Sequence, residues 1–255
     1  MITPTMTRRR LVGSLGLAGG GLLLTGCDRV AATPAFRGFV EGSERLTMDF
    51  TRLVSARDAL AREFTAADLS PVFRGNGVTN PTATDYQAMV ANGFADYRLR
   101  VDGLVRRPLS MSLPQLQAMP RRSQITRHDC VEGWSAIGQW TGVPLRLLLN
   151  QAGLLPQARY IVFHCADDYG PGKYYESVDL IDAHHPQTIL AWALNGRALP
   201  VTNGAPLRLR VERQLGYKQA KYVMRVEAVN SLAHIGGGKG GYWEDSGDYA
   251  WYAGI

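Results

Sequence analysis

Short strand-like segments dominate the second half of this 255-residue sequence. Residues 160–164 are a continuous apolar run, and residues 188–194 are another, which ends at an Asn195-Gly196 turn signal. Residues 207–211 alternate between apolar and charged side chains, and residues 222–229 are expected to form their partner strand. Few helical patterns separate these segments. We therefore expect a β-rich α+β domain with several short helices, and not an alternating βαβ sheet.

The first half contains the clearer helical signals. Residues 46–64 carry apolar side chains at helical spacing and predict one helix. Ser112 is a candidate N-cap for a short helix over residues 113–119. Residues 97–101 alternate as in a strand, and they follow a loop over residues 73–84 that is rich in Gly, Asn and Pro. A loop of this length inside a compact domain is often functional.

The N-terminus has the composition of an export signal. The paired Arg8 and Arg9 precede an apolar run over residues 11–24, which is shorter than the roughly 20 residues that cross a bilayer. This order resembles a twin-arginine signal, and Leu-Thr-Gly before Cys27 resembles a lipobox. A short uncleaved membrane anchor with an ordinary cysteine is the alternative.

These features predict how the chain is divided. We expect residues 1–27 to be a twin-arginine lipoprotein signal peptide, with Cys27 carrying lipid after processing. Residues 28–42 are then a linker, and residues 43–255 form the functional domain. The expected location is the periplasm or another extracytoplasmic compartment, with the protein lipid-anchored to the membrane.

Charge and cysteine content narrow the possible functions. The leader holds three of the 28 basic residues and no acid, so the remainder has 25 basic against 22 acidic residues, a net charge of +3. This balance, without a clustered basic helix, excludes a typical nucleic-acid-binding domain.

Outside the leader, Cys130 and Cys165 are the only cysteines of the sequence. In an oxidising compartment they either form one disulfide, or one of them is kept as a thiolate for chemistry.

Three segments together carry a recognisable pattern. They are Arg-His-Asp-Cys-Val-Glu-Gly-Trp-Ser at 127–135, Asn-Gly-Ala-Pro-Leu-Arg at 203–208 and Gly-Tyr-Lys-Gln-Ala-Lys at 216–221. In this order and spacing they resemble the sulfite-oxidase family of molybdopterin enzymes, over residues 73–255. The sequence after Cys130 is most similar to the branch of the periplasmic methionine sulfoxide reductase catalytic subunit. The resemblance implies a sulfite-oxidase-type fold and a molybdenum–molybdopterin cofactor.

The resemblance also implies a set of site residues. Cys130 matches the catalytic cysteine that binds the metal, and a soft thiolate suits molybdenum. Arg208 can offer a fork of donors to the pterin phosphate, and the loop at 219–221 can supply an anion site. The early loop provides Asn80 or, as the alternative, Asn76. The residues expected to bind the cofactor are Asn80, Cys165 (whose role is open), Asn203, Arg208, Gln219, Ala220 and Lys221.

Two other patterns point less clearly to chemistry. The histidine spacings match no usual zinc motif; His128, two residues before Cys130, either borders the metal or is structural. The glycine-rich run at 236–241 lacks the spacing of a phosphate-binding loop, so we interpret it as a turn.

The expected activity follows from the implied cofactor. We expect an oxidoreductase that transfers an oxygen atom to or from a small substrate such as a sulfoxide. The sequence has no Cys-x-x-Cys-His motif and too few cysteines for an iron–sulfur cluster. We therefore expect a separate haem-containing electron-transfer protein as partner, for which the membrane is one location, and a monomeric chain. A sulfite-oxidising dehydrogenase and a cofactor-free lipoprotein binding module are the alternatives.

Overall fold

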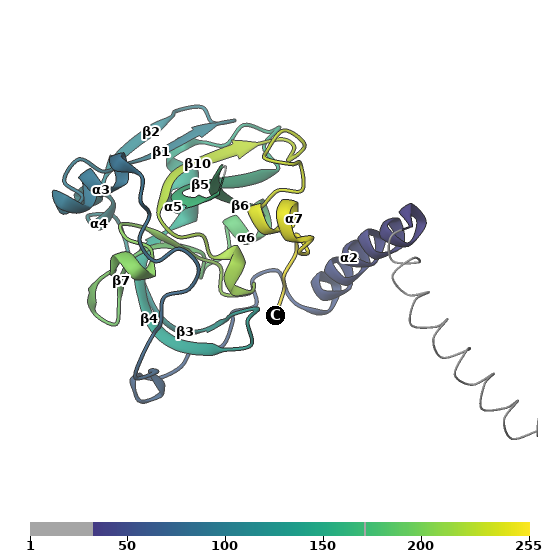
Figure 1. Cartoon of the computed structure of the whole chain (residues 1–255), viewed down its shortest axis with the longest axis horizontal. Helices are drawn as coiled ribbons and strands as arrows, with labels where there is room; N and C mark the ends of the chain where they lie inside the picture. Colours follow the sequence, from purple (N-terminus) through teal and green to yellow (C-terminus); the bar gives the residue numbers. More distant parts are fainter. Residues whose placement is uncertain (1–32, 171) are drawn as a thin grey trace, which may run out of the picture. The chain divides into compact units, whose positions relative to one another are not determined.

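The computed structural model describes residues 33–170 and 172–255 (Figure 1). The chain divides into two compact units, Met1–Thr51 and Arg52–Ile255. The predicted signal peptide, with Arg8, Arg9 and Cys27, lies outside the described residues. Within the described ranges, no helix combines the length and the apolar character that a membrane span requires.

The first described helix differs from its prediction. Helix α2 covers Pro34–Val54, so it begins inside the expected linker and ends before the expected end at residue 64. The apolar spacing continues toward the N-terminus through Phe36 and Phe39, which extends the helix in that direction. Beyond it, the Phe64 amide donates to the Ile125 carbonyl at 2.8 Å. Backbone groups that pair with a strand cannot also pair within a helix, so residues 60–64 are not helical.

One five-stranded sheet forms the larger half of the domain. Its strands lie in the order β2 (Leu109–Ser112), β1 (Arg98–Gly103), β10 (Val223–Val229), β5 (Tyr160–Tyr169) and β6 (Gly172–Asp179). The β1–β10 pair is parallel, and the other pairs are antiparallel.

A second five-stranded sheet carries the long hairpin seen below the first in Figure 1. Its order is β3 (Arg122–Asp129), β4 (Ser135–Pro144), β7 (Ile189–Leu194) and β8 (Arg197–Ala198), and β9 (Arg208–Arg210) also pairs with β7. The expected pairing of residues 207–211 with residues 222–229 is present only at their near ends, where the Val223 amide donates to the Leu207 carbonyl at 3.0 Å. As strands, β9 and β10 belong to different sheets, so the predicted strand pair is wrong. Two apolar stretches close in sequence do not specify which neighbour each one joins.

Short helices connect and cover these sheets, and the predicted α+β class is confirmed. Ser112 caps α4 (Leu113–Gln117) as predicted, since its hydroxyl accepts from the Gln115 amide and the Gln115 side chain accepts from the Ser112 amide. The remaining described helices are α3 (Thr84–Ala91), α5 (Leu145–Ala152), α6 (Leu180–Ala183) and α7 (Tyr242–Gly247), with 3₁₀ turns η1 (Ala66–Asp68), η2 (Val201–Asn203) and η3 (Gly216–Lys218).

The main core lies against the first sheet. Alternate residues of β1 and β5 point inward, among them Leu99, Val101, Ile161 and Phe163, and they pack with α5 residues such as Leu148. All five side chains are fully buried. The apolar contact between sheet and helix fixes the strand ends, and thereby the loops that leave them.

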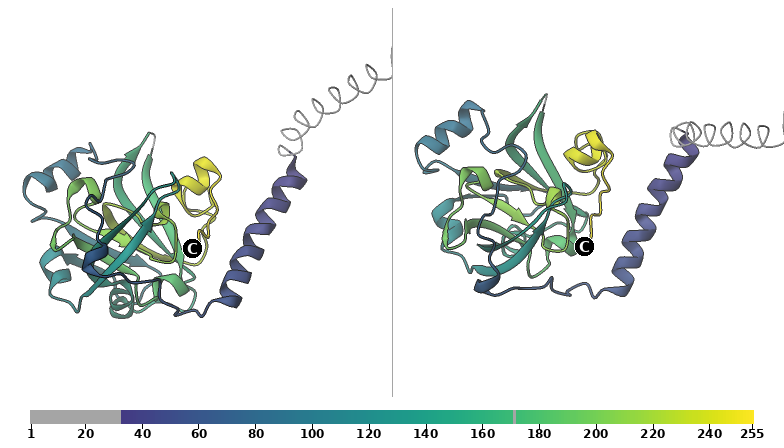
Figure 2. Two further views of the ribbon diagram at one scale, coloured as in Figure 1. Left: turned by 90° about the horizontal axis from the view of Figure 1, so that it is seen from below. Right: turned by 60° about the horizontal axis from the view of Figure 1, so that its bottom comes forward.

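A buried ionic cluster ties the C-terminal segment to the domain. The Lys218 ammonium donates to Glu176 Oε1 at 2.5 Å and to Glu244 Oε1 at 2.7 Å, and all three residues are fully buried. Burial raises the pKa of Glu176 well above its usual value, although Lys218 opposes this shift. Burial lowers the pKa of Lys218, but the two carboxyls outweigh it and raise that pKa. Glu244 lies on α7, which runs beside β6 (Figure 2), so the cluster joins this helix to the first sheet.

Candidate active site

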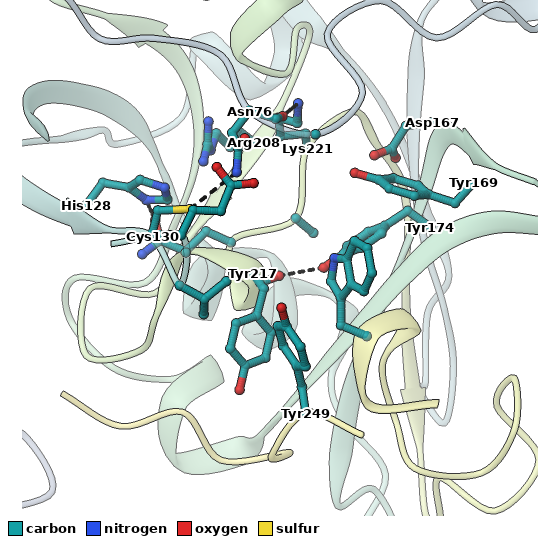
Figure 3. A pocket seen from close by; sticks show the side chains of 17 residues that line it. Asn76, His128, Cys130, Asp167, Tyr169, Tyr174, Arg208, Tyr217, Lys221 and Tyr249 are labelled. Carbon is teal, nitrogen blue, oxygen red and sulfur yellow. Dashed lines mark hydrogen bonds between the residues drawn. The ribbon is translucent and has the colours of Figure 1, made fainter. Parts of the chain in front are cut away.

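A cavity of about 170 Å³ lies among the loops of the Arg52–Ile255 unit (Figure 3). Its residues come from the early loop, the tip of the β3–β4 hairpin, β5, β6, β9, the η3 loop and the C-terminal segment. The lining consists of Asn76, Gly77, His128, Cys130, Val131, Glu132, Asp167, Tyr169, Tyr174, Arg208, Gly216, Tyr217, Gln219, Ala220, Lys221, Trp243 and Tyr249.

The β3–β4 hairpin delivers Cys130 to this cavity. The turn is closed by hydrogen bonds from the Cys130 amide to the Trp134 carbonyl, 2.9 Å, and from the Gly133 amide to the Cys130 carbonyl, 3.0 Å. Gly133 has φ +82°, a conformation that side chains disfavour. Asn76 Nδ2 donates to the Cys130 sulfur at 3.2 Å. Burial raises the pKa of the thiol, and the Arg74 and Arg208 charges oppose that shift.

Two arginines on β9 have different surroundings. Arg210 is fully buried but neutralised, because its Nε and NH2 donate to both oxygens of Glu212 at 2.9 and 2.6 Å. Arg208 is 5% exposed and donates through NH1 to the Asn203 carbonyl at 3.2 Å. Its buried Nε has no hydrogen-bond partner in the described part of the chain. Burial and the neighbouring Arg210 lower the pKa of Arg208 to about 9, so the site favours an anion beside it.

Lys221 and Asp167 add one cationic and one acidic group to the wall. The Lys221 ammonium donates to the Asn76 carbonyl at 2.5 Å and to the Val78 carbonyl. Burial and Arg208 lower the pKa of Lys221 to about 7. Burial raises the pKa of Asp167 to about 7, although Lys221 opposes this, and its buried Oδ1 has no partner among the described residues. These groups sit on the same side of the cavity in Figure 3.

His128 packs behind Cys130 as a neutral ring. Burial, Arg208 and Arg210 lower its pKa well below the usual value. Arg210 NH1 lies 3.2 Å from Nδ1, and because arginine can only donate, Nδ1 is the acceptor. Gly216 approaches the ring so closely that a Cβ there would lie 2.6 Å from His128 Cε1. His128 therefore supports the hairpin and also lines the cavity.

Aromatic side chains form much of the remaining lining (Figure 3). Tyr169 and Tyr174 come from β5 and β6, with ring centroids 5.5 Å apart. Tyr217 from η3 packs on Tyr249 at 5.0 Å, and Tyr249 stacks on Trp243 at 5.7 Å. The C-terminal segment thus supplies part of the lining, and the rings give the cavity an apolar surface beside its charged groups.

The structure brings together most, but not all, of the residues predicted from sequence. Cys130, Arg208, Gln219, Ala220 and Lys221 line one cavity. Asn80 does not: it is exposed and accepts from Gln87 at 2.9 Å. The alternative, Asn76, occupies that place.

Asn203 and Cys165 also lie outside the lining. Asn203 is buried and donates to the Phe73 carbonyl at 3.3 Å, while its own carbonyl holds Arg208. Cys165 belongs to the main apolar core, where burial raises its pKa well above the usual value. Both thiols are free, so the disulfide left open by the sequence is not formed.

Several cavity residues were not predicted. Asp167 follows the apolar run of β5, and a carboxylate at the end of a buried strand is the sequence signal that marks it. Tyr169, Tyr174, Trp243 and Tyr249 gave no such signal, because only the packing of the C-terminal segment brings them to one place.

The residues fit a metal bound to an anionic organic cofactor. Cys130 offers one thiolate ligand, and the orphaned Nε of Arg208 offers a buried cationic donor. An unsatisfied buried donor destabilises the empty protein, and a phosphate oxygen would satisfy it with a charge-assisted hydrogen bond. The Asp167 carboxylate, an acceptor without a partner on Oδ1 in the described chain, would complement ring N–H donors.

Fold and cavity together have the character of an oxidoreductase that holds a metal–organic cofactor through one thiolate. The chain belongs to the family of the oxidoreductase molybdopterin-binding domain, whose sequence model matches residues 86–234, more than half of its length. The fold is of the sulfite-oxidase type, and the cofactor is molybdenum bound to molybdopterin. The predictions of fold, family and cofactor are confirmed.

Two named relatives are similar to this chain over part of its length. The chain is 45% identical over 160 residues to a protein-methionine-sulfoxide reductase subunit, YedZ1, of Azospira oryzae, which covers 63% of this chain and 56% of that protein. It is 35% identical over 150 residues to the protein-methionine-sulfoxide reductase catalytic subunit MsrP of Xanthomonas campestris pv. campestris, covering 54% and 47%.

Among solved structures, the sulfane dehydrogenase SoxCD from Paracoccus pantotrophus is similar, with a TM-score of 0.50 and 26% identity over 54% of this chain and 39% of that chain. The chain spans about half the length of the curated relatives it matches.

Proposed function

We propose that the protein reduces a sulfoxide by oxygen-atom transfer, with the methionine sulfoxide of a protein or peptide as the leading substrate. The observation that carries the proposal is the cavity in which the Cys130 thiol faces the uncompensated Arg208 guanidinium. The names of the relatives from Azospira and Xanthomonas support the substrate class. The overall reaction takes up two electrons and two protons, and converts the sulfoxide to a sulfide and water.

The chain's own residues have distinct tasks in this proposal. When bound, the cofactor supplies the two-electron chemistry of oxygen-atom transfer. Cys130 holds the metal, and Arg208 and Lys221 bind the phosphate end. The wall of Tyr169 and Trp243 limits the access of water and offers aromatic faces to a thioether-like sulfur. Asp167, with its pKa near neutrality, can hold a proton at its carboxyl group.

The test is a Cys130→Ser variant, assayed for molybdenum per chain and for turnover. Loss of the thiolate should remove most of the activity while the fold survives, since Cys130 lies in a hairpin turn and not in a core cluster. Wild-type protein should reduce sulfoxides in a panel that also contains sulfite. Sulfite oxidation without sulfoxide reduction would support the dehydrogenase alternative, and wild-type protein without molybdenum would support the binding module.

The proposed setting is the outer face of the membrane. We propose a lipid-anchored monomer, exported by the twin-arginine route, that takes electrons from a separate haem-containing protein; the sequence pattern at residues 8–27 supports this. Replacing Arg8 and Arg9 with Lys should retain the protein inside the cell. A Cys27→Ala variant should be exported without its lipid. Fractionation with a lipid-labelling assay checks both, and label on the Cys27 variant would contradict the lipobox interpretation.

A further inference from the structure

Helix α2 presents a continuous apolar stripe. Six large apolar side chains are exposed along it, with Leu53 82% and Phe39 73% exposed. At 100° per residue, all six fall within an arc of about 100°, and the stripe is about 27 Å long. The six residues are Phe36, Phe39, Leu46, Phe50, Leu53 and Val54.

Charged residues keep to the other side of the helix. Glu44, Arg45 and Asp49 occupy an arc from about 80° to about 220° on the scale that places Phe36 at zero, whereas Arg52 in the last turn pairs with Asp179, with 2.6 Å between NH1 and Oδ2. The apolar stripe is centred near 310°, almost opposite. Of these three residues two are acidic and one is basic, so the described part of the polar face has no excess of positive charge.

We propose that α2 lies in the interfacial region of a lipid bilayer, with its apolar stripe inserted among the lipid chains and its charged face in water. A strongly amphipathic helix of low mean hydropathy is the type that lies on a membrane and does not span it. The helix begins seven residues after Cys27, at most about 25 Å of extended chain. A lipid at Cys27, the location proposed above, would therefore hold α2 at the membrane surface.

A second copy of the chain is a less suitable occupant of the stripe. The stripe covers 19 positions, less than the three to four heptads that a coiled coil usually needs. Ser43 falls inside the arc, at about 340°, and divides the apolar surface into two parts. A bilayer accepts such a gap because lipid chains are fluid, whereas knobs-into-holes packing leaves it as a defect.

The lack of excess positive charge determines which membrane α2 should bind. A basic amphipathic helix depends on anionic lipid and weakens in salt. The charged face of α2 gives no such attraction, so binding should come from the apolar stripe alone. Vesicles of pure phosphatidylcholine should bind nearly as well as vesicles with added phosphatidylglycerol, at both low and high salt.

The test uses the full chain with Cys27→Ala, which removes the site of the expected lipid. It should float with phosphatidylcholine vesicles. Adding Phe39→Gln and Phe50→Gln should lower the partition coefficient by about a hundredfold, roughly tenfold for each large apolar side chain. Glutamine is a good helix former, so circular dichroism should show the helix intact. The matched control is Leu60→Gln with Val72→Gln, which removes two exposed apolar side chains outside α2.

The outcomes separate this inference from the proposed activity. Equal flotation of the α2 variant and its control, or no flotation of the parent, would overturn it. A concentration-dependent dimer that disappears in the α2 variant would assign the stripe to a second copy instead. Molybdenum content and sulfoxide reduction, measured on the same preparations, report on the catalytic domain independently and should be equal in all of them.

Discussion

Removing the ammonium of Lys218 is the perturbation for which the structure gives the clearest magnitude. Lys218 is the cation that Glu176 and Glu244 share, and all three residues are fully buried. Burial raises the pKa of Glu176, and the Lys218 ammonium opposes that shift by favouring the charged carboxylate. In a Lys218→Met variant the packing is nearly conserved, but the remaining charge is buried without a partner. Breaking a buried pair from one side costs about 3–5 kcal/mol.

That cost should appear as a lower free energy of unfolding and a lower Tm. For a domain of about this size, each kcal/mol corresponds to about 2–4 °C, so the expected loss in Tm is about 6–20 °C. The matched control is Lys239→Met, which removes an exposed ammonium 2.6 Å from Asp248 on the same C-terminal segment. Exposed pairs contribute at most about 1 kcal/mol. Equal losses in the two variants would refute the reasoning.

The pH dependence gives a second check with a definite sign. Glu176 has a folded-state pKa above its unfolded value, so its contribution is complete below the unfolded pKa and declines as pH rises through the folded one. Without Lys218 that folded pKa rises further. The deficit of Lys218→Met should therefore be larger at pH 8 than at pH 5. Combining it with Glu176→Gln and Glu244→Gln should restore most of the stability, because no buried charge remains.

Two other predictions concern the cavity. Arg208→Lys should retain about 10–100-fold less molybdenum per chain although the charge is kept, because one charge-assisted hydrogen bond is worth about 1.5–3 kcal/mol and lysine lacks the fork of donors. Lys221→Ala should lose less molybdenum, since other donors of its loop remain. Equal molybdenum occupancy in wild type and both variants would place the phosphate elsewhere. Asp167→Asn should flatten the stability of the cofactor-free protein between about pH 4 and pH 7. Because burial raises the pKa of Asp167 from 3.8 to about 7, the contribution of this carboxyl falls over that range, by up to about 1.4 kcal/mol per unit, and changes little above it. Denaturant titrations at pH 5 and pH 7 check this, and an equal loss of stability in wild type and variant would contradict it.

The site residues that were predicted correctly from sequence are those whose position depends on neighbours close in the chain. Cys130 lies in a hairpin whose turn residues are adjacent in the chain, and Arg208 alternates with core residues on one short strand. Asn80 and Asn76 lie in the same loop, and only the approach of that loop to Lys221 decides between them. Asn203 and Cys165 lie outside the cavity lining because of contacts with residues distant in the sequence, such as the hydrogen bond from Asn203 to the Phe73 carbonyl.

The same distinction explains the errors in the fold. The N-cap at Ser112 is a contact over three residues, and its prediction is confirmed. The helix expected over residues 46–64 ends at Val54, because the backbone that follows pairs with β3 more than 60 residues away. The assignment of β9 and β10 to different sheets likewise depends on partners that local patterns do not reveal.

The order in which the cavity is assembled follows from where its walls lie in the chain. Asn76 comes from the early loop, and Tyr249 lies 173 positions later, so no shorter stretch of nascent chain contains the complete wall. Cys130 and Arg208 emerge earlier, in a cavity that still lacks Trp243 and Tyr249. A cofactor held between these groups is therefore enclosed only after synthesis of the domain is nearly finished, and its stable retention is a post-translational event.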